Sequence, residues 1–254
     1  MVSSRSLALA GATKDRGAVF GFGMTIFQLK QLASHSAAVA VGAVRWNYDR
    51  AEVIADGIVH GLGLGFGLIA TTALIVLTGI FASPPEIVSV SIYAAGLLTM
   101  LGFSAAYNLW PVSPRKWWLR RLDHSAIYVL IAATYTPFMV QMNDRVLAML
   151  LLGGVWCVAI VGIALKLLLP GRFDRLSIVL YLAMGWSGLA AYDAVFTSLP
   201  RFTLWFVIAG GALYSLGVIF HTWRRLRFQN AIWHGFVLLG AACHYTAVLD
   251  LVLT

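Results

Sequence analysis

The chain has 254 residues, of which 60% are hydrophobic and only 11% are charged, whereas a soluble domain carries about 25% charged residues. This composition excludes an ordinary soluble domain and is typical of a polytopic helical membrane protein, because a spanning helix needs about 20 mostly apolar residues. By itself, the net charge of +8 would suggest a nucleic-acid partner, but the positions of the basic residues along the chain indicate another cause.

Seven apolar segments, separated by turn residues such as those at 83–85 and 170–171, follow one another along the chain. They predict an all-α integral membrane protein with seven transmembrane helices. The expected helices cover residues 57–81, 87–109, 122–142, 147–169, 177–197, 203–222 and 231–252.

Residues 1–47 precede the first expected helix and contain one apolar stretch, GAVFGFGMTIF, which is too short to span a membrane. We expect these residues to form a disordered or interfacial extension, or to result from an upstream start codon, and we assign them no function. A signal peptide is disfavoured, because the apolar stretch lies late and no clear cleavage pattern follows it. Residues 48–254 are expected to form the membrane domain.

Lysine and arginine are concentrated in alternate connections between the expected helices. The second, fourth and sixth connections carry Arg115, Lys116, Arg120, Arg121, Lys166, Arg172, Arg175, Arg224, Arg225 and Arg227, and the others carry only Arg145 and Arg201. Because basic connections stay on the cytoplasmic side, this pattern predicts a cytoplasmic N-terminus and a C-terminus outside. Topology and contact with anionic lipid explain the basic surplus, so no nucleic-acid partner is expected.

Ionisable and amide side chains gather at the expected cytoplasmic ends of five helices. They are Glu52, Asp56 and His60; Ser104 and Asn108; Asp123 and His124; His221; and Asn230 and His234. Polar groups within a membrane are costly, usually face the protein interior and often mark functional sites. His244 lies about 15 Å deeper than His234, at 1.5 Å per helical residue, and is expected to make a separate contact.

A simpler interpretation of each polar residue is a hydrogen bond between packed helices. For one membrane histidine or aspartate this role is commoner than metal binding. Only the presence of several such groups at one depth favours a functional site.

Six stretches of the sequence carry a resemblance to a known family. They are EVIADGIVHGLGLGFG at 52–67, SAAYNLW at 104–110, RLDHSAIYVLIAATYTPF at 121–138, YLAMGW at 181–186, YSLGVIFH at 214–221 and AIWHGFVLLGAACHY at 231–245. On these residues the chain resembles the hemolysin III family, bacterial members of the progestin and adipoQ receptor superfamily, over about residues 48–254. The resemblance implies a seven-helix fold with a cytoplasmic N-terminus in the cell membrane, the inner membrane of a bacterium.

The superfamily is known for a zinc site near the cytoplasmic helix ends. One histidine comes from Ser-x-x-x-His on the second helix, and two come from His-x-x-x-His on the seventh. The resemblance therefore implies that Ser104 and Asp123 are catalytic and that His234 is a metal ligand. Asn108 and Asn230 stand at the other two ligand positions.

A carboxamide oxygen is a weaker and harder donor than an imidazole. Tight zinc binding is therefore not expected, and no cofactor is expected, unless His60, His124 or His221 supplies a replacement ligand. Both asparagines still donate and accept hydrogen bonds, so a metal-free polar network in the same place is the alternative.

The resemblance implies metal-assisted hydrolysis of a lipid amide, with membrane lipids as partners. Alternatives are a non-catalytic lipid-sensing or membrane-homeostasis protein, and the cytolysis or pore formation that the family name implies, which no long amphipathic helix supports. A proton-coupled transporter using Asp56, His60 and Asp123 also remains open. A retinal protein is disfavoured, because the seventh helix has no lysine. The sequence does not indicate an oligomeric state.

Overall fold

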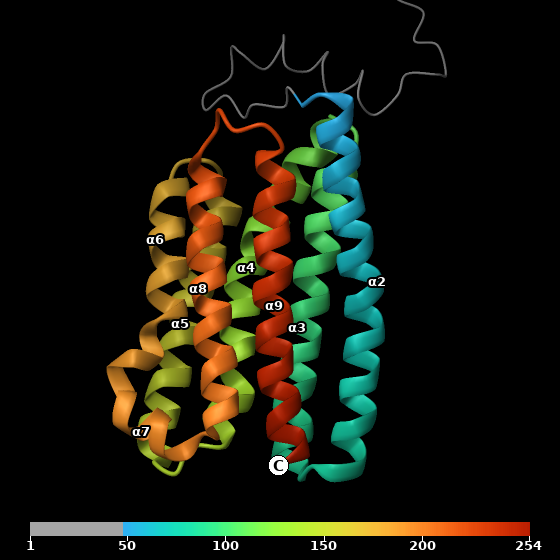
Figure 1. The fold of residues 1–254 in the computed structure, drawn as a ribbon. Helices are drawn as coiled ribbons and strands as arrows, with labels where there is room; N and C mark the ends of the chain where they lie inside the picture. Colours follow the sequence, from blue (N-terminus) through green and yellow to red (C-terminus); the bar gives the residue numbers. More distant parts are fainter. Residues whose placement is uncertain (1–47) are drawn as a thin grey trace, which may run out of the picture.

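The computed structural model describes residues 48–254, which form an elongated bundle of α-helices without β-strands (Figure 1). The helices are α2 (Arg50–Phe81), α3 (Pro84–Leu109), α4 (Pro114–Val140), α5 (Arg145–Leu168), α6 (Asp174–Gly185), α7 (Tyr192–Ser198), α8 (Arg201–Thr222) and α9 (Gln229–Leu253), with the 3-10 helix η2 (Ser187–Ala191) between α6 and α7. The expected extension over residues 1–47 lies outside the described residues. Helix α2 begins at one end of the bundle, and the C-terminus lies at the other.

Among residues 48–254, six helical stretches are long and apolar enough to cross a membrane, namely α2, α3, α5, α8, α9 and the stretch Asp174–Ser198 that contains α6 and α7. The outer face of α2 exposes large apolar side chains, including Phe66 at 65% and Ile69 at 70%. A contiguous apolar face of this kind is unfavourable in water and is suited to contact with lipid chains. The prediction of an all-α membrane protein is thereby confirmed.

Helix α2 begins at Arg50, earlier than the expected start at residue 57, because a capping box fixes its first turn. The backbone N–H of Glu52 donates to Oδ1 of Asp49, and the backbone N–H of Asp49 donates to Oε2 of Glu52, both at 2.8 Å. These two bonds satisfy amide donors that lack a partner within the helix. A search for apolar residues alone misses such a polar first turn.

Helix α4 begins at Pro114, where proline suits a first helical turn, so the expected start at residue 122 is too late. The basic residues of 115–121 therefore lie on a helix and not in a loop. Among them, Lys116 is buried and donates from Nζ to the carbonyls of Trp110 at 2.6 Å and Asn108 at 3.3 Å. These bonds close the carboxyl end of α3, where the helix dipole favours a cation.

The expected continuous helix over 177–197 is interrupted, since α6 ends at Gly185 and α7 begins at Tyr192. Tyr135 of α4 lies at the break. Its hydroxyl donates to the carbonyl of Met184 at 2.9 Å and accepts a bond of 2.9 Å from the backbone N–H of Gly188. A side chain from another helix thus replaces backbone bonds that the interruption removes.

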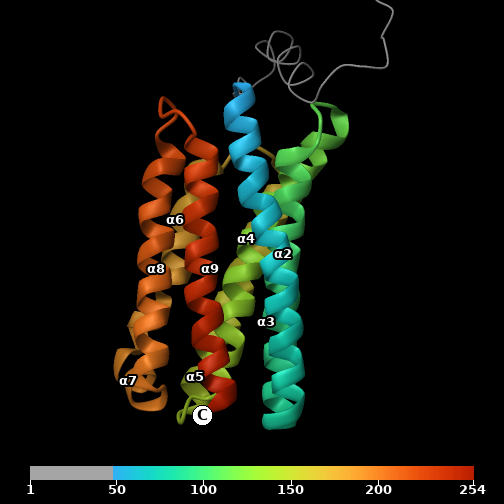
Figure 2. The same ribbon diagram turned by 45° about the vertical axis from the view of Figure 1, so that its right-hand side comes forward.

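Helix α3 packs along α4, and α8 packs along α9 (Figure 2). At the α3–α4 contact, a Cβ added to Gly96 would lie 2.5 Å from Cβ of Ala133, so only glycine permits this approach of the two backbones. This close contact fixes the position of α3, which carries Ser104, relative to α4, which carries Asp123.

Candidate functional site

Polar side chains from three helices are buried at the end of the bundle where α2 begins. They are Asp56 and His60 on α2, Ser104 and Asn108 on α3, and Asp123 on α4. On α2 and α3 the paired residues are four positions apart, which places them on one face of the helix. His234 of α9 joins them, and we call these six residues the polar cluster.

Asp56 links the two histidines of the polar cluster. Its Oδ1 lies 2.6 Å from Nδ1 of His234 and 3.6 Å from Nδ1 of His60. Nδ1 of His60 also donates a hydrogen bond of 2.7 Å to the backbone carbonyl of Asp56. Because a carbonyl can only accept, this bond places the proton of neutral His60 on Nδ1 and leaves Nε2 as the acceptor. The two rings meet edge to face, with centroids 4.4 Å apart.

Ser104 and Asn108 face the acceptor nitrogen of His60. Oγ of Ser104 lies 3.2 Å from Nε2 of His60, and Nδ2 of Asn108 lies 3.5 Å from it. The same Nδ2 donates to the backbone carbonyl of Ser104 at 3.0 Å. Asn108 therefore presents its donor group, and not its oxygen, to His60.

Asp123 completes the polar cluster from α4, where it interacts with the side chains of Ser104 and His234. The next residue, His124, has its Nε2 3.9 Å from Asp123 and packs edge-on against Tyr107. Its backbone carbonyl accepts a hydrogen bond of 2.7 Å from Tyr181 of α6. His124 therefore lies beside the cluster and belongs to the contact between α4 and its other neighbours.

Glu52 was expected to belong to the same site, but its carboxylate holds two helix starts together. Oε2 caps α2 through Asp49, and Oε1 accepts a hydrogen bond of 2.9 Å from the backbone N–H of Phe228, immediately before α9. Phe228 has a left-handed backbone conformation, with φ of 58°. The carboxylate thus aligns the first turns of α2 and α9, which carry Asp56 and His234.

Asn230 is joined to Tyr48, a residue that the sequence analysis did not select. The side chains of the two residues form a hydrogen bond. Burial, followed by the negative charges of Asp56 and Glu52, raises the pKa of Tyr48 to about 12. Tyr48 is therefore a neutral hydrogen-bond donor at neutral pH. The only sequence signal was a tyrosine directly before the polar first turn of α2.

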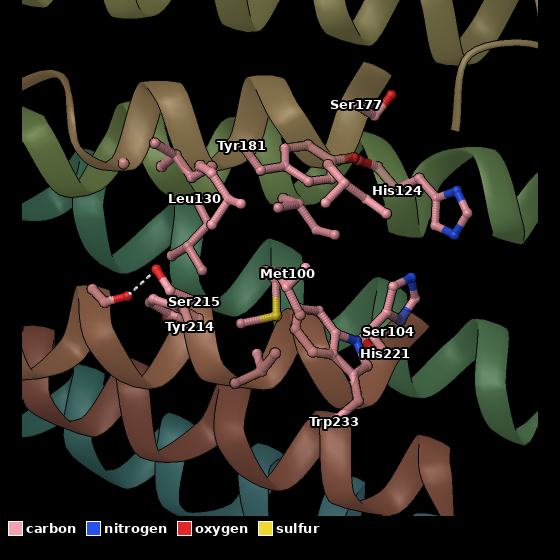
Figure 3. A pocket seen from close by; sticks show the side chains of 18 of the residues that line it. Met100, Ser104, His124, Leu130, Ser177, Tyr181, Tyr214, Ser215, His221 and Trp233 are labelled. Carbon is pink, nitrogen blue, oxygen red and sulfur yellow. Dashed lines mark hydrogen bonds between the residues drawn. The ribbon is translucent and has the colours of Figure 1, made fainter. Parts of the chain in front are cut away.

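A cavity of about 1280 Å³ runs from the polar cluster into the bundle. Figure 3 shows Ser104, His124 and His221 at one end, with Met100 and Leu130 further along. Its volume exceeds the roughly 300–1,000 Å³ of sites for drug-sized molecules. His221 packs against Trp233 in the cavity wall, with ring centroids 4.8 Å apart, and lies outside the group formed by Asp56, His60 and His234. The cavity therefore offers a polar end and a long, largely apolar interior.

His244 also lines this cavity, at a distance from the polar cluster. Its Nε2 lies 3.2 Å from the backbone carbonyl of Val207 on α8. The separate interior contact expected from its depth is therefore present.

Two basic side chains at the polar end of the cavity share one carboxylate. Arg120 and Lys166 each lie 2.7 Å from a different oxygen of Asp174, the first residue of α6. Both basic side chains are nearly buried, whereas that of Asp174 is 40% exposed. The sequence analysis treated these cations only as determinants of topology, because a partner 54 residues from Arg120 leaves no local pattern.

The polar cluster lies within the part of the chain that matches a known protein family. A model of the family described as haemolysin-III related matches residues 51–245. The chain is 38% identical over 198 residues to the hemolysin-3 homolog of Bacillus subtilis, which covers 78% of this chain and 93% of that protein. It is 36% identical over 202 residues to hemolysin-3 of Bacillus cereus, covering 80% of this chain and 92% of the relative.

A more distant similarity extends to animals. The chain is 31% identical over 172 residues to the monocyte to macrophage differentiation factor of Homo sapiens, covering 64% of this chain and 70% of that protein. No solved structure matches the chain significantly.

Proposed function

The chain belongs to the haemolysin-III related family, within the progestin and adipoQ receptor superfamily, and we propose that it is a membrane-embedded hydrolase of a lipid amide. The observation that carries this proposal is the cavity of about 1280 Å³ that begins at Ser104, Asp123 and His234 and continues between apolar side chains. Such a cavity suits a molecule with one polar group and a long hydrocarbon chain.

The chemistry follows from the side chains at the polar end of the cavity. The imidazoles of His60 and His234 and the carboxylates of Asp56 and Asp123 fit a divalent ion by donor type, even though positions 108 and 230 carry asparagine. A bound zinc ion would supply a Lewis acid for the amide carbonyl and lower the pKa of a water molecule. We propose that Asp123 accepts the proton of the attacking water and returns it to the amide nitrogen as the C–N bond breaks, which releases a fatty acid and an amine. The Ser104 hydroxyl would donate to the carbonyl oxygen, and the cavity would hold the acyl chain.

Hydrolysis is tested with the full chain in lipid nanodiscs, using an N-acyl sphingoid base as substrate. We expect release of free fatty acid, measured by mass spectrometry, and a decrease of about 100-fold or more in Asp123→Asn, as for loss of a general base. Asp193→Asn, an exposed carboxylate on α7, is the matched control. Equal release by both variants, or none by the unmodified chain, would contradict the proposal.

A second function, lipid binding without catalysis, is favoured by the hydrogen bonding of Asn108. Its amide donates towards His60 and to Ser104, as expected of a structural network. This alternative and hydrolysis give different results in the same assay. A lipid that copurifies with the chain but is not cleaved would support a sensing or homeostasis role, and leakage of vesicles without cleavage would support pore formation.

We propose that α4 is a seventh transmembrane helix, in the cell membrane, with the start of α2 on the cytoplasmic side and the C-terminus outside. This topology is supported by the basic residues, which gather where α2, α4, α6 and α9 begin. Helix α4 is polar because it faces the cavity and packs against α3 and α5. Its polar side chains therefore avoid contact with lipid.

Labelling from one side of the membrane tests this topology. In a chain with Cys157 and Cys243 replaced by serine, we expect Arg224→Cys to react with an impermeant thiol reagent only from the cytoplasmic side. Asn143→Cys, at the other end of the bundle, should react only from outside. Both positions are exposed. Reaction of both positions from the same side, or of Arg224→Cys from outside and Asn143→Cys from the cytoplasmic side, would overturn the proposed topology.

A further inference from the structure

Arg120 of α4 and Lys166 of α5 form a pair of cations in the wall of the cavity. Their side chains are only 11% and 6% exposed. The positive-inside rule accounts for basic residues at this end of the bundle. It does not account for their burial, because a buried charge loses hydration and needs a partner of opposite sign. The burial of this pair therefore indicates an anionic partner.

Asp174 supplies only part of that partner. Each of its two carboxylate oxygens lies 2.7 Å from one of the two cations, and its side chain is 40% exposed, so water weakens the attraction. Asp123 also interacts with Arg120, but its carboxylate belongs to the polar cluster, where it faces Ser104 and His234. A second anion beside Asp174 would therefore stabilise the two buried cations further.

The hydrogen bonds to Asp174 leave donors on both cations. A guanidinium has five N–H donors and an ammonium has three. Asp174 accepts one hydrogen bond from Nη2 of Arg120 and one from Nζ of Lys166. Arg120 also forms a hydrogen bond with the side chain of Tyr107. Donors therefore remain on two side chains that line the cavity.

The opening of the cavity is also strongly basic. Its lining includes four further cations, Arg121, Arg172, Arg175 and Arg224. Six basic side chains thus line the cavity, against three carboxylates, those of Glu52, Asp123 and Asp174. Arg172, Arg175 and Arg224 are exposed, so the cavity reaches the surface of the bundle beside them. A cleft lined mainly by one sign of charge attracts ligands of the opposite sign.

We propose that Arg120 and Lys166 bind the phosphate group of an anionic lipid, whose acyl chain lies in the apolar interior of the cavity. The oxygens of a phosphate group suit a planar guanidinium beside an ammonium. Met100 and Leu130 line the cavity further along (Figure 3), so the headgroup and the hydrocarbon chain each meet side chains of matching polarity. The site goes beyond the proposed function and requires neither amide hydrolysis nor a metal ion.

Native mass spectrometry of the full chain in detergent measures this binding, with phosphatidylglycerol and phosphatidylcholine of identical acyl chains as probes. We expect one tightly bound phosphatidylglycerol and weaker binding of phosphatidylcholine, whose headgroup has no net charge. Lys166→Gln should lower the affinity for phosphatidylglycerol by about 10-fold or more, as expected for loss of one charge-assisted hydrogen bond. Arg225→Gln is the matched control, because Arg225 is exposed at the same end of the bundle and is not among the residues that line the cavity.

Asp174→Asn provides a second variant if Lys166→Gln does not fold, and it distinguishes a lipid site from an ion triad that only joins α4, α5 and α6. Without the competing carboxylate, phosphatidylglycerol should bind more tightly than to the unmodified chain. It should also raise the melting temperature of this variant more than that of the unmodified chain. A purely structural triad predicts a loss of stability that phosphatidylglycerol does not restore.

Equal binding of the two lipids by the unmodified chain, or equal affinity of Lys166→Gln and Arg225→Gln for phosphatidylglycerol, would overturn the proposal. Inorganic phosphate at the same concentration should not raise the melting temperature, because it lacks the acyl chain. Stabilisation equal to that by phosphatidylglycerol would overturn the assignment to a lipid. Binding of phosphatidylglycerol without amide hydrolysis would contradict only the proposed function, and hydrolysis without preference for an anionic lipid would contradict only the phosphate site.

Discussion

Replacement of both Asn108 and Asn230 by histidine is expected to raise the affinity for zinc by about 10- to 100-fold or more, the size of change commonly produced by one partner of a metal site. Position 108 places a side-chain nitrogen 3.5 Å from Nε2 of His60. Position 230 lies one helical turn before His234, on the same face of α9. Imidazole binds zinc more strongly than a carboxamide, so both substitutions add donors where the family resemblance provides ligands.

Zinc affinity of the double variant is measured by competition with a chelating dye. Each single variant should give a smaller gain, and Asn143→His, in the exposed turn at the opposite end of the bundle, should give none. A double variant that folds but binds zinc no more tightly would show that α3 and α9 do not direct positions 108 and 230 towards His234.

Substitution of Gly96 by alanine is expected to destabilise the fold by about 1–3 kcal/mol, the usual cost of overpacking a well-packed core. The added Cβ would meet Cβ of Ala133 at 2.5 Å, and Ala133 is completely buried. The backbones of α3 and α4 must then separate, which also moves Ser104 relative to Asp123. Thermal unfolding in detergent, followed by size-exclusion chromatography, measures the change.

Gly102 of the same helix is the matched control for Gly96. A Cβ at Gly102 meets no atom within 4 Å, so alanine there should be neutral or stabilise α3 by up to about 1 kcal/mol through helix propensity. The two variants make the same chemical change on one helix and differ only in what the new methyl group contacts. If both lower the melting temperature equally, close packing of α3 on α4 is not the cause.

The sequence was sufficient to predict the membrane class, the order of the helices and the presence of a cluster of aspartate and histidine side chains. Apolar segments predict helices reliably because lipid leaves the backbone no other way to satisfy its hydrogen bonds within one segment. The spacing of Asp56 and His60, and of Ser104 and Asn108, also predicted which side chains share a helix face. Among the residues singled out, the structure groups His60 with His234 and leaves His124, His221 and Glu52 outside that contact.

Features that depend on contacts between distant segments were not predictable. The capping of α2 by Asp49 and the break after Gly185 are polar or irregular, so a search for continuous apolar residues passes over them. The pairing of Asp174 with Arg120, and of Asp56 with His234, joins residues that are 54 and 178 positions apart. No local periodicity reports such pairs, because their proximity arises only when the helices pack.

The contact between Asp56 and His234 has a consequence for the order in which the protein is made. These residues lie on α2 and α9, the first and last helices of the described chain. At roughly 5–20 residues per second, a ribosome needs about 10–35 s to reach His234 after Asp56. The carboxylate therefore enters the membrane well before its histidine partner is synthesised. Insertion of the final helix completes the polar cluster, and a nascent chain that stops before α9 cannot assemble it.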